Sequence, residues 1–165
     1  MTRTIYLTVT KKLIITVAAA LAMFSLASSA DTQSPFVGTW VLKVEKSTFD
    51  PPQPPKSQTV TVTEAPGGGS HIAIDYVYAD GSGSHMEYTT LLDGKAVPVT
   101  GSPYVDSMIA TQVTPRTIKD VYMKDGKPVS TGTVTVSKNG KTMQGPFSGT
   151  NANGVWKDRY IFVRQ

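Results

Sequence analysis

Five Asx-Gly pairs divide the second half of this chain into short segments: Asp80-Gly81, Asp93-Gly94, Asp125-Gly126, Asn139-Gly140 and Asn153-Gly154. Tight hairpin turns need positive φ values, which Asx-Gly pairs supply, so each pair predicts a reversal between antiparallel strands. Gly101-Ser102-Pro103 and Thr114-Pro115-Arg116 add two further breaks in the longest gap. Reversals at this spacing, with no helical periodicity between them, predict an all-β barrel or sandwich.

The segments between the turns alternate with a period of two residues, as half-buried strands do. Trp40 and Leu42 share one face of the first segment, and Ile72 and Ile74 share one face of the third. The segment with Pro98 is weaker, so an edge or bulged strand is expected there. Ten strands are expected, at residues 36–44, 59–63, 71–78, 85–92, 95–101, 107–114, 117–124, 127–138, 141–150 and 155–164.

Residues 1–30 have the three parts of a secretory signal peptide. Arg3, Lys11 and Lys12 precede an apolar run at 13–24, and small residues follow at 27–30. We expect cleavage before Asp31, with a retained signal anchor as the alternative. Residues 31–165 are then one domain, exported to the periplasm or the medium. The chain has no cysteine, which excludes disulfides and a lipoprotein anchor.

Charge excludes one class of partner. The whole chain has 16 basic and 12 acidic residues, and removal of the three basic leader residues leaves 13 against 12, a net charge of +1. Nucleic-acid binding needs clustered positive charge, and the remaining Lys and Arg residues are scattered. The mature chain is therefore predicted to bind no nucleic acid. We also expect it to be a monomer with no membrane span.

Residues 45–56 interrupt the strand pattern with four prolines at positions 51, 52, 54 and 55. Proline disfavours both helix and sheet, so this segment is predicted to be a stiff loop with Phe49 as its apolar anchor. A proline-rich docking site for another protein is the alternative interpretation.

Candidate catalytic and metal-binding residues are few. His71 and His85 alternate with the apolar residues of their strands, so both are expected to face outward, where neither would serve as a haem or zinc ligand. Ser84 beside His85 is explained by turn chemistry, and Gly67-Gly68-Gly69 precedes no helix that would complete a phosphate loop. The acidic strand residues are interpreted as solvated: Asp75, Glu87, Asp120 and Asp158. We predict no catalytic residue, no metal and no cofactor.

Five motifs carry a resemblance to a known family: Gly38-Thr39-Trp40, Lys46-Ser47-Thr48-Phe49, Pro55-Lys56-Ser57-Gln58-Thr59, the run 93–103 and the run 137–143. Together they resemble the exported bacterial lipocalin-like domain of the calycin group. The resemblance implies an up-and-down antiparallel barrel of about ten strands, with Trp40 closing one end and an arginine of the last strand packed across it. Arg159 and Arg164 are both candidates. The Arg-x-Tyr clamp of fatty-acid-binding proteins is not matched, because Arg159 directly precedes Tyr160 and would face the other way.

Aromatic and methionine side chains are predicted to point into the barrel: Tyr76, Tyr78, Met86, Tyr88, Met123, Met143, Phe147, Trp156, Tyr160 and Phe162. All of them except Trp156 and Phe162, together with Trp40, are predicted to bind a ligand. We therefore predict a non-catalytic protein that holds a small apolar or amphipathic molecule. Two alternatives remain open at this point. One is a solid-core envelope protein that acts through the loops at 46–56 and 101–106, and the other is a barrel cyclase or isomerase.

Overall fold

The structure is a computed structural model that describes residues 33–151 and 154–165. The predicted signal peptide lies outside these residues. Ten strands form the wall: β1 (Gly38–Leu42), β3 (Ser57–Ala65), β4 (Gly69–Val77), β5 (Gly83–Thr90), β6 (Asp93–Pro98), β7 (Ser107–Thr114), β8 (Thr117–Lys124), β9 (Lys127–Val136), β10 (Thr142–Asn151) and β11 (Gly154–Arg164). A short strand β2 (Thr48–Asp50) and two 3-10 turns, η1 (Val44–Lys46) and η2 (Pro66–Gly68), complete the described elements.

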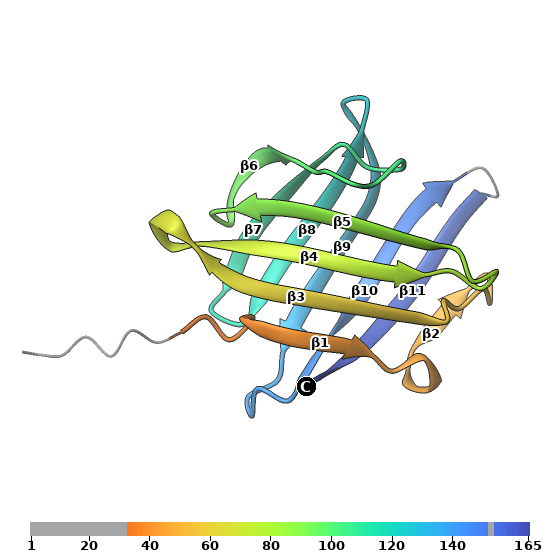
Figure 1. The fold of residues 1–165 in the computed structure, drawn as a ribbon, viewed down its shortest axis with the longest axis horizontal. Coiled ribbons are helices and arrows are strands. Elements are labelled where there is room, and N and C mark those ends of the chain that lie inside the picture. The colour runs from red at the N-terminus through yellow and green to blue at the C-terminus, as the bar shows by residue number, and fades with distance from the viewer. Residues whose placement is uncertain (1–32, 152–153) are drawn as a thin grey trace, which may run out of the picture. The chain divides into compact units, whose positions relative to one another are not determined.

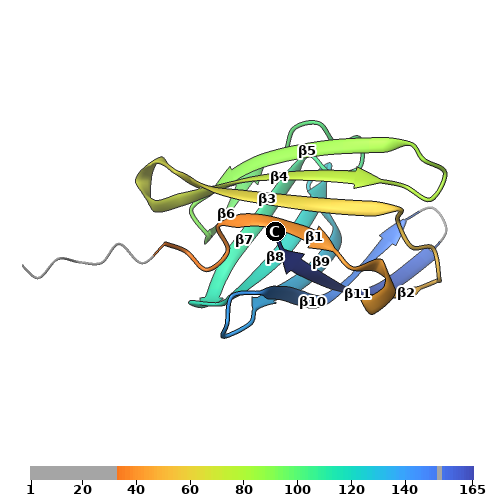
Figure 2. The same cartoon turned by 60° about the horizontal axis from the view of Figure 1, so that its bottom comes forward.

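The strands form one antiparallel up-and-down barrel. Apart from β2 and the step from β5 to β6, each strand pairs with the next along the chain, and β11 returns to pair with β1, where Trp40 lies opposite Arg164. Figures 1 and 2 show β1, β3, β4 and β5 as one wall and β7 to β11 as the wall across from it. The all-β fold predicted from the alternation and the turn residues is confirmed, and so is the up-and-down barrel that the family resemblance implied.

The seam between β5 and β6 is the weakest part of the wall. It is closed beyond β6 by a pair of backbone hydrogen bonds between Glu87 and Thr100, each 3.0 Å long. The pairing of β6 with β7 shifts register between Asp93 and Ala96, as expected for a bulged edge strand. The chain reverses at Leu91 and Leu92, before Asp93-Gly94, so the turn predicted at that pair was placed about two residues late.

Strand β2 corrects the prediction that residues 45–56 form only a loop. Its three residues pair with β11, with Phe49 opposite Asp158. It therefore extends the wall along β11 beyond the end of β1. Phe49 packs edge-on against Tyr160, with ring centroids 5.8 Å apart. The predicted apolar anchor thus forms part of the barrel, and the prolines follow it.

Trp40 and Arg164 close one end of the barrel. Trp40 is fully buried, and its Nε1 donates a 2.7 Å hydrogen bond to the carbonyl of Phe36. The guanidinium of Arg164 lies 4.2 Å from the centre of the Trp40 ring. The same group donates hydrogen bonds to three backbone carbonyls, those of Pro35, Val37 and Gly140. Of the two arginines that the sequence left open, Arg164 is the one that packs on Trp40.

Gly38 is required by this closed end. Its φ is +136°, and a Cβ atom placed on it would lie 2.5 Å from Nη1 of Arg164. Gly38→Ala is expected to lower the free energy of unfolding by about 2 kcal/mol, against about 1 kcal/mol for Gly126→Ala. Gly126 is the matched control because its φ is also positive, +73°, with open space beside it. Urea unfolding of both variants measures the difference, and equal losses would contradict a steric role for Arg164.

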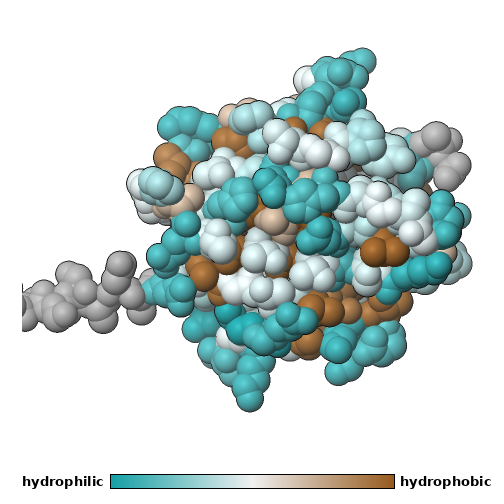
Figure 3. Space-filling model, viewed as in Figure 1, coloured by the Kyte–Doolittle hydropathy of each residue, from teal (hydrophilic) through white to brown (hydrophobic). Residues whose placement is uncertain are grey.

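The outer face of β3, β4 and β5 is mainly hydrophilic, with hydrophobic residues in small separate patches (Figure 3). Within the described part of the chain, no helix has the length and apolar character needed to cross a membrane.

Candidate functional site

The barrel encloses a cavity of about 320 Å³. Alternate residues of the surrounding strands line it, because successive side chains of a strand point to opposite faces. Its aromatic lining residues are Phe36, Tyr76, Tyr78, Tyr88, Tyr104, Tyr122, Phe147, Trp156, Tyr160 and Phe162. Its aliphatic and methionine residues are Val60, Val62, Ile72, Ile74, Met86, Leu92, Val105, Ala110, Ile118, Val134 and Met143. Its polar residues are Gln58, Ser70, Ser84, Thr90, Ser102, Asp120 and Ser130.

Aromatic rings form a continuous group along one side of this cavity. Tyr160 of β11 is at its centre, with its ring centroid 5.5 Å from that of Phe147 and 6.1 Å from that of Phe162. Phe147 in turn lies 6.5 Å from Tyr122. The Phe147 ring covers Gly132, which has no side chain to obstruct it. The strands thus hold these rings against one another on the cavity wall.

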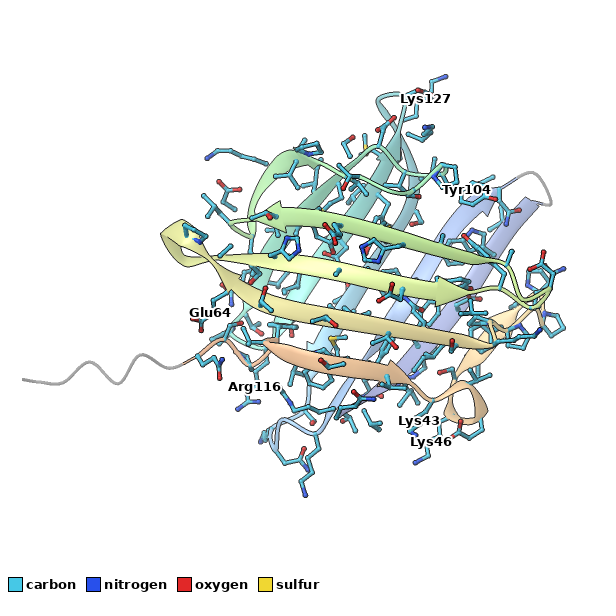
Figure 4. All side chains as sticks on the ribbon, in the orientation of Figure 1. Lys43, Lys46, Glu64, Tyr104, Arg116 and Lys127 are labelled. Atoms are coloured by element: carbon cyan, nitrogen blue, oxygen red, sulfur yellow. The ribbon has the colours of Figure 1, made fainter. Side chains whose placement is uncertain are left out.

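The end opposite Trp40 forms the rim of the cavity. Tyr104, in the loop between β6 and β7, lines the cavity and is also 66% exposed, so the cavity reaches solvent beside it (Figure 4). The hydroxyl group of Tyr78, which directly follows β4, lies 3.2 Å from that of Ser84 on β5. Trp156 of β11 also lines this region. A ligand entering the barrel would pass these side chains.

Asp120 is the charged residue most deeply buried in the wall. It lies on the inner face of β8, is 6% exposed and lines the cavity. Burial raises the pKa of its carboxyl group from 3.8 to about 7. Burial also raises the pKa values of Tyr88 and Tyr122, and the nearby Asp120 charge adds to both increases. The two phenols are therefore neutral near pH 7, while Asp120 is poised between its charged and neutral forms.

A second polar group lies nearer the rim. The hydroxyl of Tyr160 donates a 2.9 Å hydrogen bond to Asp158, whose pKa is raised mainly by burial. Burial and the charges of Tyr78 and Asp158 raise the pKa of Tyr76 to about 12. On neighbouring β3, Gln58 lines the cavity with a buried side-chain oxygen that has no hydrogen-bond partner.

Basic side chains are absent from the lining. Of the described residues around the cavity, none is Lys, Arg or His. Arg159 lies on the outer face of β11, where its guanidinium donates a 3.1 Å hydrogen bond to Gln144. Tyr160, the next residue, faces inward, as the comparison with the Arg-x-Tyr clamp predicted. The labelled Lys43, Lys46, Arg116 and Lys127 all lie at the periphery in Figure 4.

The structure places most of the predicted interior residues on the cavity surface: Tyr76, Tyr78, Met86, Tyr88, Met143, Phe147, Trp156, Tyr160 and Phe162. Trp40 does not line the cavity, because it is sealed beneath Arg164 at the closed end. Met123 is also outside it, because it follows the inward Tyr122 in β8 and so faces outward. The interpretation of Asp120 as solvated was wrong. Gln58, Tyr104 and Tyr122 are further lining residues that the sequence prediction did not name.

The histidines lie on the outside, as predicted. His71 contacts the Thr89 hydroxyl at 3.1 Å, and the two ring nitrogens of His85 each lie 2.7 Å from a carboxylate, Asp75 on one side and Glu87 on the other. The hydrogen bonds to these carboxylates raise the pKa of His85. Ser84 lines the interior, so it does not pair with His85. Among the described residues, no group of three or more potential ligands is arranged to hold a metal ion.

No protein-family model and no curated protein matches this chain. Several solved structures resemble it in fold. A redesigned β-barrel is 18% identical, with a TM-score of 0.47, over 80% of this chain and 93% of its own. The fluorescent protein UnaG is 15% identical, with a TM-score of 0.47, over 76% and 95%. The zebrafish ileal bile-acid-binding protein, in complex with cholic acid, is 9% identical, with a TM-score of 0.47, over 80% and 100%. At these identities and scores, the likenesses say nothing about what this chain binds.

Proposed function

We propose that this chain is an exported, non-catalytic, lipocalin-like barrel that binds a small, mainly apolar molecule in its interior. The observation that carries the proposal is the cavity of about 320 Å³ lined by aromatic and aliphatic side chains. Ligand pockets have volumes from about 300 Å³ upward, with mostly apolar walls and a few polar groups. This cavity fits the lower end of that range.

Two alternatives from the sequence fit the interior less well. A solid-core protein that acts through its loops has no need of a lined cavity that reaches solvent beside Tyr104. A barrel enzyme needs an acid, a base or a nucleophile within reach of its substrate. The Asp120 carboxyl group is one such acid or base, and among the described residues no cation or histidine lines the cavity to work with it. Export to the periplasm or the medium, and the family itself, rest on the signal-peptide pattern and the sequence motifs.

Binding is testable with the neutral fluorescent probe N-phenyl-1-naphthylamine. The wild-type protein is expected to bind it with saturable enhancement of its emission. Ala110 is 2% exposed and lines the cavity, so Ala110→Phe places a ring in the ligand volume. The variant is expected to bind the probe about ten-fold more weakly, because the new ring fills part of the cavity and the probe then buries less apolar surface.

Lys119→Phe is the matched control, because it adds the same ring to the outer face of neighbouring β8. It is expected to bind the probe as the wild type does. Circular dichroism and thermal melting verify that both variants are folded. A folded wild type that gives no saturable enhancement, or an Ala110→Phe variant that binds as the wild type does, would overturn the proposed binding function.

A further inference from the structure

Two acceptors on the cavity surface, the Asp120 carboxyl group and the Gln58 side-chain oxygen, receive no hydrogen bond from the part of the chain that the structure describes. Among the described residues, no side chain donates a hydrogen bond to the Asp120 carboxyl group. Its partners across the strands are Ala110 on β7 and Gly132 on β9, too small to cover it. Its oxygens therefore face the cavity. The buried side-chain oxygen Oε1 of Gln58 is a second acceptor with no hydrogen-bond partner.

A buried acceptor without a donor costs about 1–3 kcal/mol, and more when it is charged. A donor supplied by the ligand removes this cost. Apart from Asp120, the ionisable groups that line the cavity are phenols, and one of them, Tyr160, is hydrogen-bonded to Asp158, so a ligand carboxylate would meet no cation there. The rings of Tyr88 and Tyr122 lie near Asp120, and aromatic faces attract positive charge.

We propose that the cavity selects hydrophobic amines: molecules with an apolar body whose ammonium group hydrogen-bonds to Asp120 and lies against the tyrosine rings. This inference rests on the proposed binding function and names the chemistry of its ligand. It excludes fatty acids and other carboxylate amphiphiles as preferred ligands, because their head group would be buried beside Asp120 without a counter-ion.

Above neutral pH, Asp120 and an amine ligand have the opposite charges that this contact needs. The groups that face Asp120 are the phenols Tyr88 and Tyr122, which stay neutral because their pKa values are raised. The Asp120 carboxyl, with its pKa near 7, is mostly ionised at pH 8. An aliphatic amine resembles a lysine side chain, with a pKa of about 10.4, and is still charged there. At pH 8 both partners therefore carry their charges.

Three indoles with different head groups test the proposal: tryptamine, tryptophol and indole-3-acetate, of which the last has one methylene group fewer. Each is measured at pH 8 by calorimetry and by displacement of N-phenyl-1-naphthylamine. Tryptamine is expected to bind about ten-fold or more tightly than either of the others, because a charge-assisted hydrogen bond is worth more than a neutral one. Equal affinity of tryptamine and tryptophol, or tighter binding of indole-3-acetate, would overturn the proposal.

Asp120→Asn removes the charge and keeps the shape of the side chain. It is expected to weaken tryptamine binding about ten-fold while changing tryptophol binding by less than about three-fold. Glu64→Gln is the control, because Glu64 is an exposed carboxylate on β3 that lies at the barrel periphery in Figure 4. It should leave all three affinities unchanged, and an equal loss in both variants would show an effect of net charge only and reject the proposed contact.

The probe separates this inference from the proposed function. Wild-type protein that binds N-phenyl-1-naphthylamine and not tryptamine would reject the amine ligand and leave the binding function intact. Wild-type protein that binds neither would reject both.

Discussion

Arg164→Met is expected to lower the free energy of unfolding by about 3 kcal/mol. The guanidinium of Arg164 donates to the carbonyls of Pro35, Val37 and Gly140 and lies over the ring of Trp40. Methionine keeps much of the apolar stem and removes every donor, which leaves three partly buried carbonyls without partners. The closed end is held by these bonds, because they join the segment before β1 to the turn between β9 and β10. Urea unfolding monitored by tryptophan fluorescence measures the loss.

Arg159→Met is the matched control on the same strand. Arg159 lies on the outer face of β11 and donates one exposed hydrogen bond to Gln144, so its loss is expected to cost less than about 0.5 kcal/mol. The environment of Trp40 should change only in the Arg164 variant, with a red shift of its emission as water reaches the ring. Similar losses in both variants would show that the closed end does not depend on Arg164.

The topology was predictable because two local signals agree along most of the chain. Asx-Gly pairs marked the reversals; at Asp125-Gly126 both residues adopt the positive φ values that such a turn needs, 50° and 73°. Alternation then marked the strands. Strand β2 was not predicted because it has only three residues and directly precedes the prolines. Its pairing depends on the distant β11, which no local pattern reveals.

The lining was predictable only where the alternation is unambiguous. In β4, Ile72, Ile74 and Tyr76 share one face, and all three line the cavity. In β8 the apolar residues Val121, Tyr122 and Met123 are consecutive, and Lys119 and Asp120 put a charge on each face. Alternation alone does not show which face of such a strand points into the barrel. The register with β7 decides it, because it pairs Tyr122 with the fully buried Met108 and Asp120 with Ala110.

Asp120 was therefore assigned outward by the rule that charged strand residues face solvent. The rule fails here because the cavity leaves space for a carboxyl group on the inner face of β8. The sequences of folded proteins break such local rules mainly at functional or strained positions. A carboxyl group that is 6% exposed, without a partner, and inside an apolar cavity is a position of this kind.

The burial of Asp120 predicts a large pH dependence of stability. Its pKa is about 7 in the folded protein and near 3.8 in the unfolded chain. Between pH 4 and 7 the folded state holds a proton that the unfolded state has released, so stability falls as pH rises through this window. The free energy of unfolding falls by about 4 kcal/mol in total across this window. Below pH 4 and above pH 7 the contribution of Asp120 no longer changes with pH.

Asp120→Asn isolates this contribution, because an amide of the same shape does not titrate. The free energy of unfolding of wild type minus that of Asp120→Asn is expected to decrease by about 4 kcal/mol between pH 4 and pH 8. Subtraction cancels the other titrating groups, including Asp158 and His85, whose pKa values are also raised. Parallel curves for the two proteins would mean that water in the cavity solvates the Asp120 carboxylate. The same measurement therefore reports whether the interior that a ligand would enter is dry, which decides how strongly an ammonium group there would be attracted to Asp120.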